Sequence, residues 1–390
     1  MKTRVGQYAF TFLLMFAVGL GLPTSPLLAS RMGATWIEIG LMGAAWGLVF
    51  TFSAFLTGRI SDKVGKRPVL AASGALSALA AVLFLRASTV SELIIIRGLE
   101  GLAWACFWPP MEALATETAG TEQVGRGIGL ITTVYGIAFA IGSFSGGSLA
   151  DVFGFPLAFG TYLGTASLAT VTAWFVESPK HEQPKQPLAR GRFLPRLFSR
   201  TIAAGNLLGA SYTFGLASVM ALLSVYAVGL GIPVFWIGVA FSTFWAGRVI
   251  GAASAGSASD RFGRRRVAVV GLILGCIGFA LVGVANEIIA LAGGVLLAGV
   301  SVGASFPVSV AIIADNIQAD LRGSAMGFFE MICAIAFMTA SALGGAAAQV
   351  LSPRSPYGAS AIVYVSCAVA LCVLLPARQG GKMKQPPVLK

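Results

Sequence analysis

The chain has 390 residues, of which 56% are hydrophobic and only 11% are charged. Soluble proteins carry about 25% charged residues, so this composition excludes an ordinary soluble enzyme and indicates a polytopic membrane protein. The formal net charge of +12 does not indicate a nucleic-acid-binding protein, because the basic residues gather in the short segments between apolar runs. There they are typical of loops that face the cytoplasm and anionic lipid headgroups.

Apolar runs long enough to cross a bilayer, which takes about 20 residues in a helix, follow one another along the chain. They cover residues 7–30, 36–57, 68–86, 92–117, 126–149, 156–176, 201–229, 235–256, 267–285, 288–313, 323–348 and 359–375. The first run resembles a signal peptide, but because further spans follow it we expect it to be retained. The predicted fold is an all-α integral membrane protein with twelve transmembrane helices in two six-helix halves.

A segment rich in Pro, Lys and Arg separates the two sets of six spans. We expect a first half over 1–178, a cytoplasmic linker over 179–200, a second half over 201–378 and a cytoplasmic tail over 379–390. Most Lys and Arg residues fall in the two termini and the even-numbered loops. This asymmetry places both termini in the cytoplasm and predicts a multi-pass protein of the plasma or inner membrane.

A ten-residue stretch after the second span recurs after the eighth. Residues 58–67 read GRISDKVGKR and residues 256–265 read GSASDRFGRR, so both fit G-x-x-S-D-[KR]-x-G-[KR]-R. The offset between the copies is 198 residues, and the same offset relates Pro109 to Pro307. A period shared by loops and prolines indicates two pseudo-symmetric copies of one membrane-embedded half, which is typical of secondary transporters.

At the repeated loop the sequence resembles the major facilitator superfamily. The family signature G-x-x-x-D-[RK]-x-G-[RK]-[RK] is met in full at 58–67, and the copy common between spans eight and nine is complete at 256–265. An intramembrane Arg followed by Gly, at Arg97-Gly98, matches a second signature in span four. The resemblance covers about residues 5–378. It implies a transporter that works by alternating access between two halves.

The drug:proton antiporter branch of that family carries G-x-x-x-G-P-x-x-G-G in span five. Residues 138–147 read AFAIGSFSGG, which keeps three of the glycines but has Ser143 for the proline and Ala138 for the first glycine. In its motifs the chain is nearest to this branch. A glycine-rich packing helix is the alternative interpretation of the same residues.

The two loop copies predict a turn and a helix contact in each half. Gly65 and Gly263 stand where a left-handed turn residue is needed. Asp62 and Asp260 are carboxylates at the membrane edge, where the free N–H groups of a helix N-terminus are suitable partners. The resemblance implies that Asp62 meets the start of span eleven and Asp260 the start of span five.

In each half, a basic loop residue is matched by an acidic residue at the end of the next even-numbered span. Lys66 and Glu117 of the first half correspond, at the same offset, to Arg264 and Asp315 of the second. The pairs predict a loop-to-span salt bridge in each half, and together two matched latches that close the cytoplasmic side in the outward-facing state. The predicted gate residues are Gly58, Asp62, Lys66, Glu117, Gly256, Asp260, Arg264 and Asp315.

Ionisable residues inside spans are costly, so each is a candidate functional residue. In span four, Arg97, Glu100 and Glu112 share a helical face of about 120° with Trp104 and Trp108, at 100° per residue. Such a stripe is incompatible with lipid. We therefore expect it to line a cavity between the two halves.

Arg248 in span eight and Glu330 in span eleven both lie roughly 12 Å from the cytoplasmic ends of their spans, at ~1.5 Å per residue. Neither has a charged equivalent at the 198 offset, which favours a specialised role. We expect the two to be partners or to share one polar cluster.

The only histidine, His181, lies in the linker, so a carboxylate must carry any coupled proton. As the proton carrier, Glu330 and Glu112 are favoured over Glu100, and the choice between Glu330 and Glu112 stays open. Four further polar residues are either cavity groups or satisfied hydrogen-bonders between helices: Tyr135, Asn206, Tyr212 and Tyr226. The candidate substrate and proton residues are Arg97, Glu100, Trp104, Trp108, Glu112, Tyr135, Asn206, Tyr212, Arg248 and Glu330.

The sequence thus predicts a secondary active transporter, with proton-coupled efflux of a small lipophilic or cationic compound as the leading function. A Walker A loop, a nucleophile motif and metal-ligand spacing are absent from the sequence, so we expect no enzyme, no cofactor and no metal, with the proton gradient as the energy source. The expected partners are the small-molecule substrate, protons and the lipid bilayer, with no nucleic acid, and the expected state is a monomer. A transporter of a small organic anion or sugar, clamped by Arg97 and Arg248, is the alternative. A non-transporting receptor or scaffold on the same fold is the third interpretation.

Overall fold

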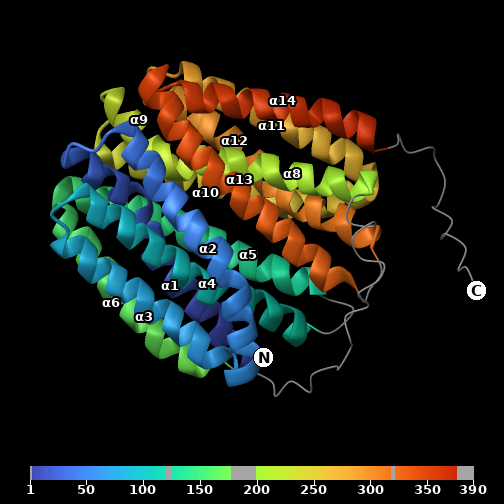
Figure 1. Ribbon diagram of the computed structural model, residues 1–390, viewed down its shortest axis with the longest axis horizontal. Helices are drawn as coiled ribbons and strands as arrows, with labels where there is room; N and C mark the ends of the chain where they lie inside the picture. Colours follow the sequence, from blue (N-terminus) through green and yellow to red (C-terminus); the bar gives the residue numbers. More distant parts are fainter. Residues whose placement is uncertain (1, 120–123, 177–198, 318–320, 376–390) are drawn as a thin grey trace, which may run out of the picture.

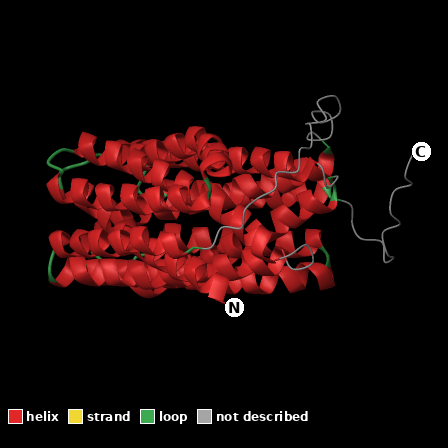
Figure 2. Ribbon diagram, turned by 90° about the horizontal axis from the view of Figure 1, so that it is seen from below, coloured by secondary structure: helices red, strands yellow, loops and turns green. Residues whose placement is uncertain are grey.

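The computed structural model describes residues 2–119, 124–176, 199–317 and 321–375, without the side chains of 2–4, 116–119, 124–128 and 322–324. Throughout these ranges the elements are helices joined by short turns (Figure 2). The expected linker over 179–200 lies outside the described residues except for its last two positions. The expected tail over 379–390 lies outside them entirely.

Six long helices form the first half. They are α1 (Lys2–Arg31), α2 (Trp36–Val64), α3 (Lys66–Arg86), α4 (Val90–Ala119), α5 (Val124–Val152) and α6 (Phe155–Thr172), which ends in the 3-10 turn η1 (Ala173–Phe175). Within this half α1 packs on α5 and α6, α2 packs on α4, and α3 packs on α4 and α6.

Six spans form the second half. They are α8 (Arg200–Ala217), which continues through the π-helical turn η2 (Ser218–Leu222) into α9 (Leu223–Gly229), then α10 (Val234–Phe262), α11 (Arg264–Val284), α12 (Ile288–Asp315), α13 (Arg322–Val350) and α14 (Ser355–Leu374). Here α8 packs on α13 and α14, α10 on α12, and α11 on α12 and α14. Each packing pair of the first half thus has its counterpart in the second, which confirms the two pseudo-symmetric halves.

Ten of these helical rods are long and apolar enough to cross a membrane by length and composition. The remaining two, α4 and α6, pack along those rods inside the first half (Figure 1). Their place in the bundle completes the twelve transmembrane helices that the sequence predicts.

A single glycine joins the helices at each repeated loop. Gly65, between α2 and α3, has φ +91°, and Gly263, between α10 and α11, has φ +93°. Residues with a Cβ rarely adopt this backbone conformation, so glycine is required for so sharp a reversal. The predicted turn role of both glycines is confirmed.

The halves meet along α2 with α13 and α5 with α10; α2 and α13 lie side by side at the front of the molecule (Figure 1). At the end opposite the repeated loops, backbones touch through glycines. A Cβ on Gly345 would lie 2.8 Å from Cα of Gly40, and one on Gly147 would lie 2.6 Å from Cα of Gly238. These two crossings are related by the 198-residue offset. We call this the glycine end, and the end that carries the repeated loops the motif end.

At the motif end, the glycines of the same four helices have no such close backbone contact. A Cβ added at Gly58, Gly129, Gly256 or Gly327 would meet nothing within 4 Å. At the glycine end the backbone N–H of Trp36 also donates a 2.9 Å hydrogen bond across the halves to the side chain of Gln349. The close backbone contact between the halves therefore lies at the glycine end.

Candidate substrate and proton site

A cavity of about 100 Å³ lies between the two halves, with walls from α2, α4 and α5 on one side and from α8, α10, α12 and α13 on the other. Eight of its lining residues are aromatic, and the polar ones include one arginine and one glutamate. The lining residues are Trp46, Phe50, Trp104, Trp108, Thr132, Tyr135, Tyr212, Thr213, Leu216, Arg248, Phe306, Glu330, Cys333, Ala334 and Phe337.

Aromatic contacts cross the interface on both sides of the cavity. On α4, Trp104 and Trp108 stand one turn apart with ring centroids 6.4 Å apart and planes at 12°. Trp108 meets Phe306 of the second half at 6.4 Å, and Trp46 meets Phe337 at 5.0 Å. Both tryptophans predicted on the α4 face therefore line the cavity, and aromatic rings hold its walls together.

Arg248 is held by aromatic groups from both halves. It donates a 2.6 Å hydrogen bond to the hydroxyl of Tyr135 on α5. Its guanidinium carbon lies 5.1 Å from the Tyr135 ring centroid and 4.9 Å from the ring of Trp245, three residues before it on α10. Such cation–π contacts strengthen where water is excluded.

Glu330 lines the same cavity, but the salt bridges between described residues do not include one from it to Arg248. The two residues therefore share one cavity, without a hydrogen bond or ion pair between them among the described contacts. Trp108 of α4 lines the same cavity as this carboxylate. The Oε1 atom of Glu330 is buried and has no hydrogen-bond partner among the described residues. Among the cavity-lining residues, it alone has such an atom.

Arg97 and Glu100 of α4 form a closed cluster with Tyr162 inside the first half. The Arg97 guanidinium pairs with the carboxylate of Glu100, and the hydroxyl of Tyr162 on α6 donates to Glu100 Oε1 at 2.8 Å. Arg97 and Glu100 are only 6% and 4% exposed, and neither lines the central cavity. The expectation that the whole charged stripe of α4 lines that cavity is therefore wrong for these two, and Glu112 is not among the lining residues either. Packing inside the first half keeps this face of α4 away from lipid, and Tyr162 of α6 supplies Glu100 with a polar partner.

Asn206 is also away from the cavity. It is buried on α8, and its side-chain oxygen has no hydrogen-bond partner among the described residues. Tyr212, one and a half turns further along α8, does line the cavity, as expected. Of the two polar residues proposed on this helix, the structure brings only Tyr212 to the central site.

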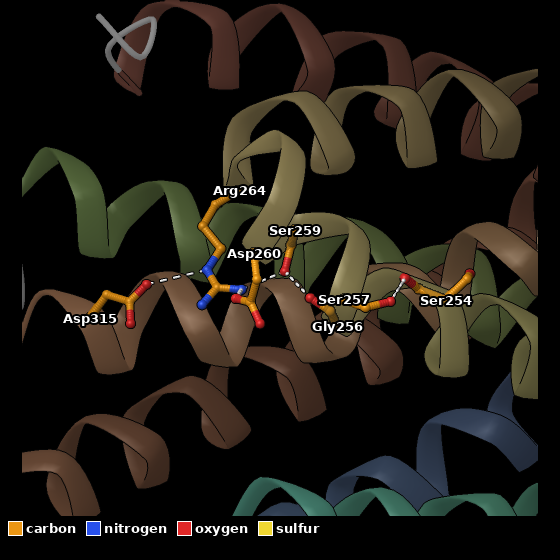
Figure 3. A network of polar contacts seen from close by, with 7 residues as sticks. All are labelled: Ser254, Gly256, Ser257, Ser259, Asp260, Arg264 and Asp315. Atoms are coloured by element: carbon orange, nitrogen blue, oxygen red, sulfur yellow. Dashed lines mark hydrogen bonds and ion pairs between the residues drawn. The ribbon is translucent and has the colours of Figure 1, made fainter. Parts of the chain in front are cut away.

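The second repeated loop forms an ion-pair network at the motif end (Figure 3). Arg264 Nε lies 3.2 Å from Asp315 at the end of α12, and another nitrogen of the same guanidinium lies 2.7 Å from Asp260. The guanidinium also donates to the hydroxyl of Ser259. The loop-to-span contact expected between Arg264 and Asp315 is thus present. Asp260 pairs within its own loop, and the side chains at the start of α5, where it was expected, lie outside the described residues.

The first loop is described less completely. The side chain of Glu117, the expected partner of Lys66, lies outside the described residues, as do the side chains at the start of α13, where Asp62 was expected. Lys66 is buried, with 4% of its surface exposed, and Asp62 is exposed. Arg67 donates to the backbone carbonyl of Val176 at the end of the first half. This loop therefore also ties two helices of its half together.

Several cavity residues were not predicted from the sequence, although a signal for some was available. On α13, Cys333, Ala334 and Phe337 follow Glu330 at the i+3, i+4 and i+7 positions of one helical face. Trp245 precedes Arg248 by three residues. The helical face of a charged intramembrane residue thus identifies its cavity neighbours on the same helix. Trp46, Phe50 and Phe306 lie on helices without charged residues in the cavity and carried no such signal.

Two pseudo-symmetric six-helix halves that enclose a central cavity, with closely packed backbones at one end, define the class of secondary transporters. The family model of the Major Facilitator Superfamily matches residues 8–242 and 205–390. The chain therefore belongs to the Major Facilitator Superfamily, a family of transporters.

Two related sequences are named differently: one is called uncharacterized, and the other is named for a resistance function. An uncharacterized transporter of this type from Methanocaldococcus jannaschii, MJ1560, is 23% identical over 90% of this chain and 92% of its own length. The quinolone resistance protein NorA of Staphylococcus aureus is 23% identical, over 56% of this chain and 57% of NorA.

Two solved structures share the fold at 16% sequence identity. A point mutant of the nucleoside transporter NupG has a TM-score of 0.78 and covers 96% of this chain and 100% of its own. The human organic anion transporter MFSD10 has a TM-score of 0.70 and covers 95% and 99%. At this identity both show the fold alone.

Proposed function

We propose that this protein exports a small lipophilic or cationic compound in exchange for protons, by alternating access of one central cavity. The observation that carries the proposal is the unpartnered Oε1 of Glu330 in an otherwise aromatic cavity between the halves. A buried carboxylate without a counter-charge is costly unless it binds a proton or a cation. Glu330 is therefore suited to bind both exchanged species, the proton and the cationic compound.

The cavity walls favour an aromatic or cationic substrate. Trp104, Trp108 and Tyr212 line the cavity, and aromatic rings attract both flat apolar molecules and cations. Arg248, the cation of the cavity, is already held by Tyr135 and Trp245. Glu330 is the carboxylate of the lining, which favours a cation or hydrogen-bond donor over an anion.

The basic loops support an orientation for the cycle. Both repeated loops lie at the motif end, and the positive-inside rule assigns that end to the cytoplasm of a plasma or inner membrane. The close backbone contact of the halves at the glycine end supports a state whose cavity is closed on the side away from the cytoplasm. An exporter would load its substrate in this state.

The named relatives support the proposal unequally. NorA is named for quinolone resistance, and quinolones are aromatic compounds, which agrees with an aromatic cavity. NupG and MFSD10 are named for nucleosides and organic anions. Their likeness to this chain supports the fold, while the choice of substrate rests on the cavity.

Purified protein in proteoliposomes with an imposed pH gradient tests the proposal. Ethidium serves as the cationic aromatic probe, and uridine and succinate represent the other substrate classes. We expect ethidium to move against its gradient only while the pH gradient is present. Ethidium movement that is unaffected by the gradient would contradict proton coupling, and no movement of any probe would favour a receptor or scaffold.

Transport of a small anion or sugar remains the second candidate because Arg248 lines the cavity. Of the two arginines that the sequence suggested as an anion clamp, only Arg248 lines the cavity, because Arg97 is buried against Glu100 inside the first half. Succinate or uridine uptake that is lost in Arg248→Ala, with no ethidium transport, would support this candidate over export.

A further inference from the structure

A second, smaller cavity lies inside the first half, next to the central one. It measures about 10 Å³, which is roughly the room that one water molecule needs. Its walls come from α1, α2, α3 and α4, so all of its lining residues belong to the first half. The structure therefore has two unequal spaces beside α4, and we call the smaller one the side cavity.

Two tryptophans stand between the side cavity and the central cavity. Trp46 of α2 and Trp104 of α4 line both spaces, with ring centroids 5.8 Å apart. The ring of Trp46 meets Phe337 at 5.0 Å. The ring of Trp104 meets Tyr135 at 5.9 Å and Phe107 at 5.6 Å. Of the two spaces, Phe337 and Tyr135 line only the central cavity, and Phe107 lines only the side cavity. The tryptophan pair therefore forms a partition with one cavity on each side.

The backbone that carries Trp46 is held from two sides. A Cβ added at Gly101 on α4 would collide with the backbone carbonyl of Trp46, and one added at Gly47 would lie 3.2 Å from Cβ of Met338 on α13. Helices packed this closely leave little room for the backbone to shift. The opening between the two cavities is therefore set by the size of the side chains in the partition.

The chemistry of the side cavity suits an apolar group. Three apolar side chains of α1, among them Val18, line it. Its hydroxyl and its carboxylate come from Ser77 and Glu100, and the charge of Glu100 is already paired with Arg97. An uncharged apolar tail is therefore better suited to this space than a second cation.

We propose that Trp46 and Trp104 set the upper length of the transported compound, because they keep its apolar end out of the side cavity. A compound whose cationic end lies near Glu330 has room only as far as the two indoles. A smaller side chain in place of either indole joins the cavities and offers apolar wall to a longer tail. Each added methylene group that finds such room strengthens binding about fourfold. This inference rests on the proposed function for the cationic end, while the length limit depends only on the partition.

A series of amines that differ only in chain length tests the limit. Binding of phenethylamine, phenylbutylamine and phenylhexylamine to the purified full-length protein is measured by isothermal titration calorimetry. In the wild type, we expect phenylhexylamine to bind no more tightly than phenylbutylamine. In Trp104→Ala, it should bind at least fourfold more tightly. Trp104→Ala/Val18→Phe fills the side cavity from α1 and should restore the wild-type limit. Trp174→Ala, at an exposed tryptophan of η1, is the matched control and should keep that limit.

Trp46→Ala removes the other member of the partition and provides a second test if Trp104→Ala does not fold. An unchanged limit in the folded tryptophan variants, or a raised limit that Val18→Phe does not reverse, would overturn the inference. Phenylalkanols of the same lengths carry no charge and separate this inference from the proposed function. If the alcohols show the limit and the amines do not bind, the proposed cationic substrate is wrong while the partition stands. Absence of binding by both series would contradict both.

Discussion

Two clusters in this protein contain the same three side-chain types and arrange them differently. In the first half, Arg97, Glu100 and Tyr162 pair with one another and are closed off from the central cavity. Between the halves, Arg248 bonds to Tyr135. There the glutamate, Glu330, keeps a buried oxygen without a partner.

The difference shows how membrane charges divide into structural and functional ones. The first cluster lies between helices of one half, α4 and α6, which need not separate for the halves to move. Its partners can therefore stay together throughout a transport cycle. The second cluster lies across the surface on which the halves move, so an unpaired group there can exchange partners. Pairing within one half predicts a role in stability, and an open position across the halves predicts a role in transport.

The largest expected effect comes from breaking the closed cluster. Arg97→Ala leaves the Glu100 carboxylate buried without its cation, which costs about 3–5 kcal/mol for a buried ion pair. We expect a large fall in thermal stability and in the yield of folded protein in detergent, measured by a fluorescence-based melting assay. The double variant Arg97→Leu/Glu100→Leu removes both charges and should recover much of the loss. A stable Arg97→Ala variant that has lost only transport would reverse the assignment.

The second prediction concerns the open cluster of Arg248, Tyr135 and Glu330 between the halves, where a substitution should reduce transport rather than stability. Glu330→Leu removes a carboxylate that lacks a partner, so unfolding stability should stay the same or rise. Gradient-driven ethidium transport in proteoliposomes should fall about a hundredfold, which corresponds to about 2.7 kcal/mol. Measuring both properties on the same preparation separates the clusters. Destabilisation of Glu330→Leu as severe as that of Arg97→Ala would remove the distinction.

The architecture was predictable from the sequence because it depends on features that act locally. Span length follows from apolar runs, and the sharp turns at Gly65 and Gly263 follow from glycine alone. The contact of Arg264 with Asp315 was predictable because the 198-residue repeat places both residues at helix ends next to each other. Periodicity and repetition are enough for such features.

The division of α4 was not predictable in the same way. A helical wheel places Arg97, Glu100 and Glu112 on one face, but it does not tell which helix covers each level of that face. Tyr162 covers the level of Glu100, while Trp108, one turn before Glu112, lines the central cavity. The wheel therefore gives the direction of a side chain, and only the packing of distant segments gives its partner.

A third prediction compares the tyrosines, beginning with the closed cluster. Tyr162→Phe removes the 2.8 Å hydrogen bond to Glu100 and leaves the ring in place. Hydrogen bonds to charged groups contribute about 1.5–3 kcal/mol, so the melting temperature should fall measurably. Transport by the protein that remains folded should be close to normal, measured per molecule in proteoliposomes. A transport defect without loss of stability would connect this cluster to the cavity.

The smallest expected effect belongs to Tyr135→Phe in the open cluster. The variant removes the hydroxyl that accepts from Arg248 at 2.6 Å but keeps the aromatic ring beneath the guanidinium. Because Arg248 retains both cation–π contacts, stability should change by less than about 1 kcal/mol. The freed guanidinium is then able to turn toward Glu330, and pairing with it would compete with a cationic ligand for the carboxylate. We therefore expect the apparent affinity for ethidium to fall about threefold, in a concentration series read against wild type, with coupling to the pH gradient intact. An unchanged affinity would mean that Arg248 stays in place without the Tyr135 hydroxyl, and that the aromatic rings alone keep Glu330 open.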